Sequence, residues 1–173
     1  MQNRKKLRRA VSRILVPTDF SDCSAAALEF AVTLAKPFHA ALILVHVIEP
    51  LPYNGMEGLM LIDYQPLLKS RAKALLDRLS KLPLKENLPV ATHLTDGIPF
   101  REIINLAKRE KADLIVIGTH GRTGFDHLLT GSVAEKVVRL STCPVVAVHS
   151  QPAVPRRKGM KRKRKAEMGS QRG

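Results

Sequence analysis

Short apolar runs alternate with stretches of helical periodicity through the middle of the chain, and this alternation limits the possible folds more than any other feature. Most of the runs are continuously apolar, which is typical of strands covered on both faces. They fall at residues 14–16, 40–48, 90–95, 113–117 and 144–148. Strands that alternate with helices predict a parallel sheet with helices on both faces, joined by right-handed crossovers.

Helix boundaries are indicated by caps and prolines. The first helix is expected to begin after Ser21 or Asp22 and to end at Pro37, and the second to cover residues 66–82. Pro99 suits the first turn of a third helix, and Ser132 with Glu135 has the spacing of a capping box for a fourth. Between the first two helical units, residues 49–63 contain prolines and glycines, which predicts a long loop and a candidate lid.

A glycine-rich stretch, residues 118–133, follows the fourth apolar run and leads into a helix. Glycine allows positive φ and lets the backbone approach a ligand closely, while the first N–H groups of a helix attract anions. We therefore expect a phosphate-binding loop. The turn at Pro17, Thr18 and Asp19 leaves the first strand at the same edge of the sheet. In a flavodoxin-like order the first and fourth strands are neighbours, so the two loops would face one crevice.

Several familiar sites are disfavoured. The glycines lack the lysine of a Walker A loop, since Gly124 precedes Phe125 and Gly131 precedes Ser132. No dinucleotide fingerprint and no SGGxDS-type loop of the ATP pyrophosphatases follows the first strand. The two cysteines are 120 residues apart, without zinc-ligand spacing, and suit a reducing compartment. No arrangement of nucleophile and base is visible, so no catalytic residue is expected.

Taken together, five ordered pieces of the sequence resemble the universal stress protein family, in its ATP-binding branch. The resemblance covers about residues 12–150, and the pieces are Ile14 to Asp19, His46-Val47, Ala112 to Gly118, the loop Gly118-x2-Gly121-x9-Gly131-Ser132, and Cys143 to Val148. It implies a three-layer α/β/α sandwich, Rossmann-like and similar to the adenine nucleotide alpha hydrolases, with a five-stranded parallel sheet of order 3-2-1-4-5. It also implies an intracellular stress role and homodimers that pair their fifth strands, here residues 145–149.

The resemblance further implies which residues bind an adenine nucleotide. Those expected against the adenosine are Pro17, Thr18, Asp19 and, at the adenine edge, Val47; those expected around the ribose and phosphates are Gly118, His120, Gly121, Arg122, Gly131, Ser132 and Val133. Mg²⁺ or Mn²⁺ would accompany ATP, held mainly by phosphate oxygens and water. The family function would be regulatory, with at most slow hydrolysis.

Simpler roles stay open for two of these positions, and a simple role is expected for His46. Asp19 can accept a hydrogen bond from a ribose hydroxyl or an adenine amine, but it can also close an Asx turn. Ser132 can cap a helix. His46, on an apolar run, is better interpreted as a hydrogen-bonded histidine in the core or at its rim than as a catalytic base.

The net charge of +14 lies in the two ends of the chain. Residues 1–13 carry +6 and residues 151–173 carry +8, so residues 14–150 are formally neutral. We expect a basic extension at 1–12, one domain at 13–150 and a basic, disordered tail at 151–173. The alternative function is RNA or DNA association through residues 156–165, without base stacking because aromatic residues are lacking. No signal peptide or membrane span is expected, so the predicted location is the cytoplasm.

Overall fold

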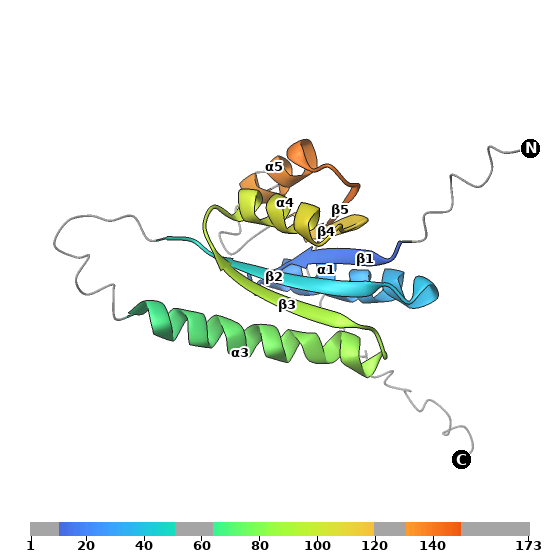
Figure 1. Ribbon diagram of the computed structural model, residues 1–173, viewed down its shortest axis with the longest axis horizontal. Helices are drawn as coiled ribbons and strands as arrows, with labels where there is room; N and C mark the ends of the chain where they lie inside the picture. Colours follow the sequence, from blue (N-terminus) through green and yellow to red (C-terminus); the bar gives the residue numbers. More distant parts are fainter. Residues whose placement is uncertain (1–10, 51–63, 120–130, 150–173) are drawn as a thin grey trace, which may run out of the picture.

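Five parallel strands form one sheet in the computed structural model, which describes residues 11–50, 64–119 and 131–149 (Figure 1). The strand order is β3-β2-β1-β4-β5, so the predicted order is confirmed. The strands are β1 (Arg13–Pro17), β2 (Ala41–Ile48), β3 (Val90–Asp96), β4 (Leu114–Gly118) and β5 (Val145–Val148).

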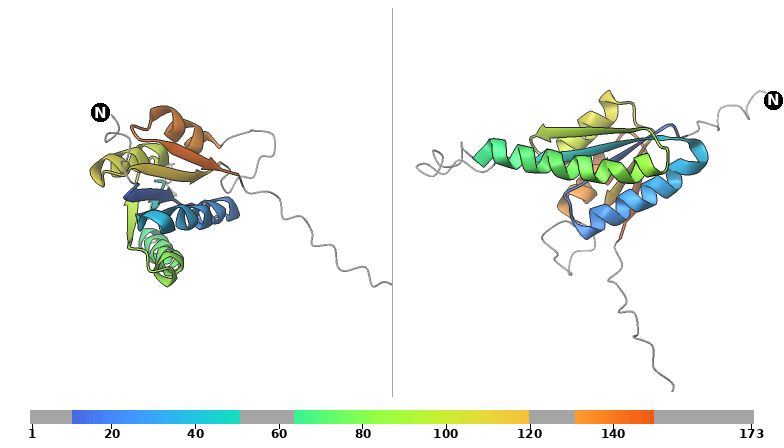
Figure 2. Two further views of the ribbon diagram at one scale, coloured as in Figure 1. Left: turned by 90° about the vertical axis from the view of Figure 1, so that its right-hand side faces the viewer. Right: turned by 90° about the horizontal axis from the view of Figure 1, so that it is seen from below.

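Helices cover both faces of the sheet and complete a three-layer sandwich. One face carries α1 (Asp22–Ala35) and α3 (Tyr64–Lys85), and the other carries α4 (Pro99–Arg109) and α5 (Ser132–Leu140) (Figures 1 and 2). A short 3-10 helix, η1 (Lys36–Phe38), extends α1. The lid expected at 49–63 and the two basic extensions lie outside the described residues, except for residues 11–12 and 49–50.

Alternate residues of the central strands point to opposite faces, so the sheet separates two apolar cores. Ile14, Leu42 and Leu114 pack with α1 and α3, whereas Leu15 and Ile43 pack with α4 and α5. Both sets are almost completely buried. This burial on two faces explains why the sequence of these strands is continuously apolar rather than alternating.

The helix starts follow local rules at two positions. Ser21 caps α1, and its hydroxyl oxygen accepts a hydrogen bond from the Ser24 N–H at 3.3 Å. Pro99 occupies the first turn of α4, where a missing N–H costs nothing. The second predicted helix is longer than expected, since α3 runs from Tyr64 to Lys85 and includes Pro83. Pro83 lies in the last turn, where it disturbs little of the helix.

Candidate functional site

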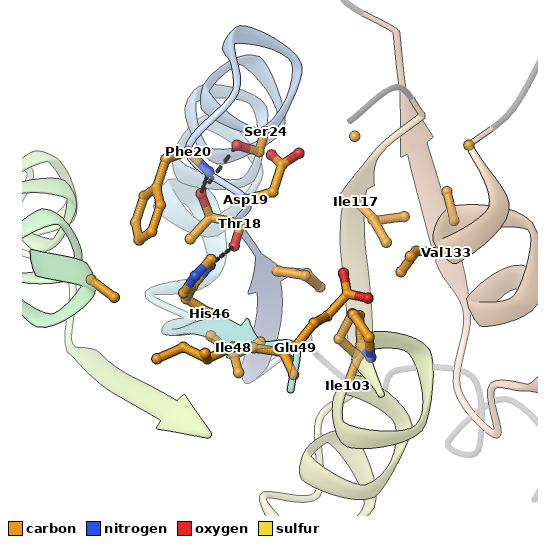
Figure 3. A pocket seen from close by; sticks show the side chains of 18 of the residues that line it. Thr18, Asp19, Phe20, Ser24, His46, Ile48, Glu49, Ile103, Ile117 and Val133 are labelled. Atoms are coloured by element: carbon orange, nitrogen blue, oxygen red, sulfur yellow. Dashed lines mark hydrogen bonds between the residues drawn. The ribbon is translucent and has the colours of Figure 1, made fainter. Parts of the chain in front are cut away.

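A cavity of about 970 Å³ opens at the carboxyl ends of β1, β2 and β4 (Figure 3). The turn after β1 and the start of α5 both line it, so the expectation that these two loops face one crevice is confirmed. The reason is topological, because β1 pairs with both β2 and β4 and the chain reverses its winding direction there.

Most of the residues expected at the site lie around this cavity. Its lining includes Pro17, Thr18, Asp19, Val47, Gly118, Gly131, Ser132 and Val133. His120, Gly121 and Arg122 lie outside the described residues. The sheet therefore brings together eight positions drawn from four separate parts of the sequence.

The turn after β1 is held by a small hydrogen-bonded network. The Phe20 N–H donates to Thr18 Oγ1 at 3.0 Å, and Thr18 Oγ1 lies 3.1 Å from Ser24 Oγ. Phe20 has a φ of 65°, an unusual backbone conformation for a bulky residue, which this network and the packing of its ring sustain.

His46 supports the same turn from the end of β2. Its Nδ1 lies 2.7 Å from the carbonyl oxygen of Thr18, and since a carbonyl only accepts, Nδ1 carries the proton and donates. The Phe20 ring packs on the imidazole with centroids 4.3 Å apart (Figure 3). The interpretation of His46 as a hydrogen-bonded histidine at the rim of the core is confirmed.

Asp19 closes an Asx turn. Its Oδ1 accepts hydrogen bonds from the Ser21 N–H at 3.1 Å and from the Ser21 hydroxyl at 2.6 Å. Burial raises the pKa of Asp19, but the hydrogen bonds from Ser21, with smaller contributions from the Ser24 hydroxyl and the backbone, outweigh it and leave the pKa below its ordinary value. A charged, positioned carboxylate therefore lines the cavity at neutral pH.

Gly118 ends β4 close to Cys23 of α1. A Cβ at this position would lie 3.0 Å from the carbonyl carbon, the carbonyl oxygen and Sγ of Cys23. Positive φ is not the reason for glycine at 118 or 131, since Gly97 alone has this conformation among the described glycines. Glycine is required at position 118 because two backbones approach closely, and the partner of that approach is α1.

The capping box predicted from Ser132 and Glu135 is wrong, because Ser132 is not the N-cap of α5. Gly131 is the N-cap, with φ −61° and ψ 144°, and among the described residues no side chain caps the helix. The carbonyl of Thr119 accepts a hydrogen bond from the Gly131 N–H, which holds Gly131 extended and makes Ser132 the first helical residue. Ser132 is one position too late to cap, so its exposed side chain lines the cavity without serving the helix end.

Sequence reasoning missed several cavity residues contributed by the helices and by the end of β2. They include Glu49 after β2, Ile103 of α4 and Arg71 of α3 (Figure 3 shows the first two). Glu49 had a usable signal, because it stands two residues after Val47 and continues the same face of β2. The helix residues had none, since only the packing of α3 and α4 places them here.

A Rossmann-like α/β domain with its cavity at the switch point of the sheet is the class that this fold and site define. The chain belongs to the universal stress protein family, whose family model matches residues 10–149. Universal stress protein MJ0531 of Methanocaldococcus jannaschii is 37% identical over 138 residues, which cover 79% of this chain and 81% of that protein. Universal stress protein YxiE of Bacillus subtilis is 32% identical over 145 residues, covering 79% and 98%.

Solved structures show the same fold, and two of them were determined with nucleotides. UspA of Lactobacillus plantarum has a TM-score of 0.73 at 26% identity, covering 80% of this chain and 97% of that one. A universal stress protein in complex with cAMP has a TM-score of 0.62 at 27% identity, covering 82% and 99%. One from Archaeoglobus fulgidus in complex with dAMP has a TM-score of 0.58 at 25% identity, covering 80% and 98%.

No group of three or more His, Cys, Asp or Glu side chains within 11–50, 64–119 and 131–149 is arranged to hold a metal ion. Over the same ranges, none of the helices combines the length and the apolar character that a membrane span requires.

Proposed function

We propose that this protein binds an adenine nucleotide, ATP in the first instance, in the cavity at the ends of β1, β2 and β4, and acts as a regulatory stress-response protein of the cytoplasm. The observation that carries the proposal is that a charged carboxylate, Asp19, and the first turn of a helix, α5, line one cavity. Such a cavity offers an acceptor to the nucleoside and N–H groups to the phosphates. Relatives solved with cAMP and dAMP support the choice of nucleotide.

In this proposal the phosphates lie against the backbone N–H groups at Ser132 and Val133, and the adenosine lies against Asp19 and Val47. The N-cap of α5 is Gly131, which has no side chain to occupy the first N–H groups, and such groups suit an anion. Gly118, Gly121 and Gly131, with His120 and Arg122, would complete the ribose and phosphate contacts. Mg²⁺ or Mn²⁺ would be held by phosphate oxygens and water.

A regulatory role suits the site better than turnover. His46 lines the cavity, but its Nδ1 donates to the Thr18 carbonyl and its ring packs on Phe20. That arrangement makes His46 a support for the turn after β1 rather than a base for hydrolysis, which agrees with slow turnover at most. Bound ATP would then act by changing the affinity for a partner, including a second copy of the chain.

Two measurements on the purified full-length protein test the proposal. Mass spectrometry of small molecules released by denaturation should detect an adenine nucleotide, and calorimetry of nucleotide-stripped protein should show saturable binding of ATP with magnesium. Absence of released nucleotide together with no heat at millimolar ATP would reject the proposal.

A second candidate function follows from the charge of the chain ends. We propose the division into residues 1–12, 13–150 and 151–173, with the nine Lys or Arg residues of the last segment available to a polyanion. Deleting 151–173 should leave ATP binding unchanged and reduce binding to RNA or DNA at low salt. Loss of ATP binding on truncation would contradict this division.

A further inference from the structure

Glu49 continues a face of β2 that ends in the cavity. Ile43, Val45 and Val47 alternate along β2 and pack in the core formed with α4 and α5. Glu49 is the next residue in this alternation, one position beyond the strand. Figure 3 shows its side chain pointing across the cavity, between Ile103 and Ile117. The carboxylate thus lies on the same side of the sheet as the start of α5.

Asp19 reaches this side of the sheet from the neighbouring strand. Leu15 of β1 belongs to the core formed with α4 and α5, and Asp19 has the same parity four residues later. The order of the sheet therefore places three features in sequence along the cavity: the start of α5 beside β4, then Asp19 after β1, then Glu49 after β2. Neighbouring strands are about 4.8 Å apart, so the β4 and β2 ends are separated by about 10 Å.

We propose that Glu49 determines the base specificity of this site by accepting a hydrogen bond from the exocyclic amine of adenine. The inference rests on the proposed function. With the phosphates at the start of α5, a nucleotide that crosses the cavity presents its ribose to Asp19 and its base to Glu49. The span of about 10 Å from β4 to β2 suits a ribose and a purine in extension.

The chemistry of the two carboxylates favours this assignment. An ionised carboxylate only accepts hydrogen bonds, and the edge of adenine offers it the 6-amino group. Asp19 is held rigidly, since its Oδ1 already accepts two hydrogen bonds from Ser21, and it is nearer the phosphate end. Glu49 has a longer side chain and is exposed, so it can follow the edge of a base. A purine with a carbonyl oxygen at position 6 would place two acceptors against each other.

The test measures the affinity of full-length, nucleotide-stripped protein for ATP and for purine riboside triphosphate, which lacks only the 6-amino group. The unchanged protein should bind ATP about tenfold more tightly, the effect of one hydrogen bond to a charged acceptor at an accessible site. In Glu49→Ala this ratio should fall to near one, through weaker ATP binding. Inosine triphosphate, with a carbonyl at position 6, should bind the unchanged protein least.

Glu29→Ala is the matched control, because it removes an exposed carboxylate of α1 that does not line the cavity. It should leave the ratio unchanged. A ratio that stays near tenfold in Glu49→Ala would overturn the inference, as would a change in the preference for ATP over dATP instead, which would assign Glu49 to the ribose. If the unchanged protein bound none of these nucleotides, the proposed function itself would fail, and this inference with it.

Discussion

In the turn from Thr18 to Ser24, single residues make more than one hydrogen bond. Ser21 caps α1 through its hydroxyl oxygen, and the same hydroxyl donates to Asp19 Oδ1. The hydroxyl oxygen of Thr18 accepts a hydrogen bond from the Phe20 N–H, and its carbonyl oxygen accepts one from His46 Nδ1. Because each contact fixes the next, the carboxylate of Asp19 is positioned before any ligand arrives, which lowers the entropy cost of binding.

We expect Asp19→Asn to make the stability less sensitive to acid. Folding lowers the pKa of Asp19 from its ordinary value of 3.8, so its contribution is fully present above that pH and is lost as the pH falls through the folded pKa. Asparagine keeps the Oδ1 acceptor but does not titrate. Urea unfolding should show a loss of about 1 kcal/mol at pH 7 and a shallower decline as the pH falls below the ordinary value of 3.8.

The control for this pH series is Glu29→Gln, which neutralises an exposed carboxylate of α1. It should follow the unchanged protein throughout. An acid decline in Asp19→Asn as steep as that of the unchanged protein would show that Asp19 does not contribute.

Gly118→Ala should destabilise the fold by about 1–3 kcal/mol, measured by urea unfolding. The added methyl group would lie 3.0 Å from the backbone carbonyl of Cys23, so α1 must move away from β4. Cys23→Ala in the same chain removes only the Sγ contact and should recover only part of the loss. A change below about 0.5 kcal/mol would mean that α1 shifts easily.

At the residue scale, the sequence predicts which residues line the cavity better than it predicts the contacts that each of them makes. The choice of Asp19 was correct as a cavity residue, and its Asx turn was among the open alternatives. Gly118 lines the cavity as expected, but the close approach that requires glycine there is to Cys23 of α1, which the sequence does not predict. That contact joins residues 95 positions apart, and no local pattern encodes such a distance.

At the scale of elements, the starts of α1 and α5 differ in a way that bears on function. Both helices begin at the edge of the cavity, but Ser21 caps α1 while α5 has only Gly131 before it. At a capped helix start, a side chain accepts a hydrogen bond from one of the first N–H groups. At an uncapped start, these N–H groups are available to solvent or a ligand. The missing cap of α5 is therefore consistent with a phosphate site.

Ser132→Ala separates the structural from the ligand role of this serine. Because Ser132 is the first helical residue and not the cap, we expect the free energy of unfolding to change by less than about 0.5 kcal/mol. If its hydroxyl contacts a phosphate, calorimetry should show ATP affinity reduced about fivefold. Ser21→Ala is the comparison, since loss of a true cap should cost about 1 kcal/mol. Equal losses of stability in the two variants would contradict the assignment of the caps.

The elements themselves were largely predictable, for a physical reason. Burial on both faces imposes continuous apolar runs, and Pro99 and Ser21 mark helix starts by local chemistry. The capping box at Ser132 failed because the hydrogen bond between Thr119 and Gly131 fixes the boundary, and that bond closes a long loop. Pro83 does not end α3 where a proline predicts an end, because it lies in the last turn, where one helical hydrogen bond at most is lost.

At the scale of the whole molecule, the sheet has two edges with different surroundings. β3 and β5 are the edge strands, and β5 is short and only partly buried. Edge strands present unpaired backbone groups that natural proteins cover, charge or use for pairing. Residues 14–150 are also formally neutral, since the charge of +14 belongs to residues 1–13 and 151–173. Repulsion between two copies of the domain would therefore be small.

The resemblance to the family predicts a homodimer that pairs residues 145–149, and the register of β5 supplies a direct test. The carbonyls of Pro144 and Val148 accept hydrogen bonds from β4, so by alternation the backbone groups of Ala147 point away from the sheet. Ala147→Pro removes only this outward N–H. We expect the variant to keep its fold, by circular dichroism, and to become monomeric, by sedimentation velocity.

Thr92→Pro is the matched control at the opposite edge. The carbonyl of Pro89 accepts a hydrogen bond from Leu42, so the same alternation turns the N–H of Thr92 outward from β3. This variant loses an equivalent edge donor and should remain dimeric. A dimer that survived Ala147→Pro but dissociated in Thr92→Pro would place the interface on β3. Because β3 borders α3 and the β2 end, that result would couple dimerisation to the Glu49 side of the cavity rather than to the α5 side.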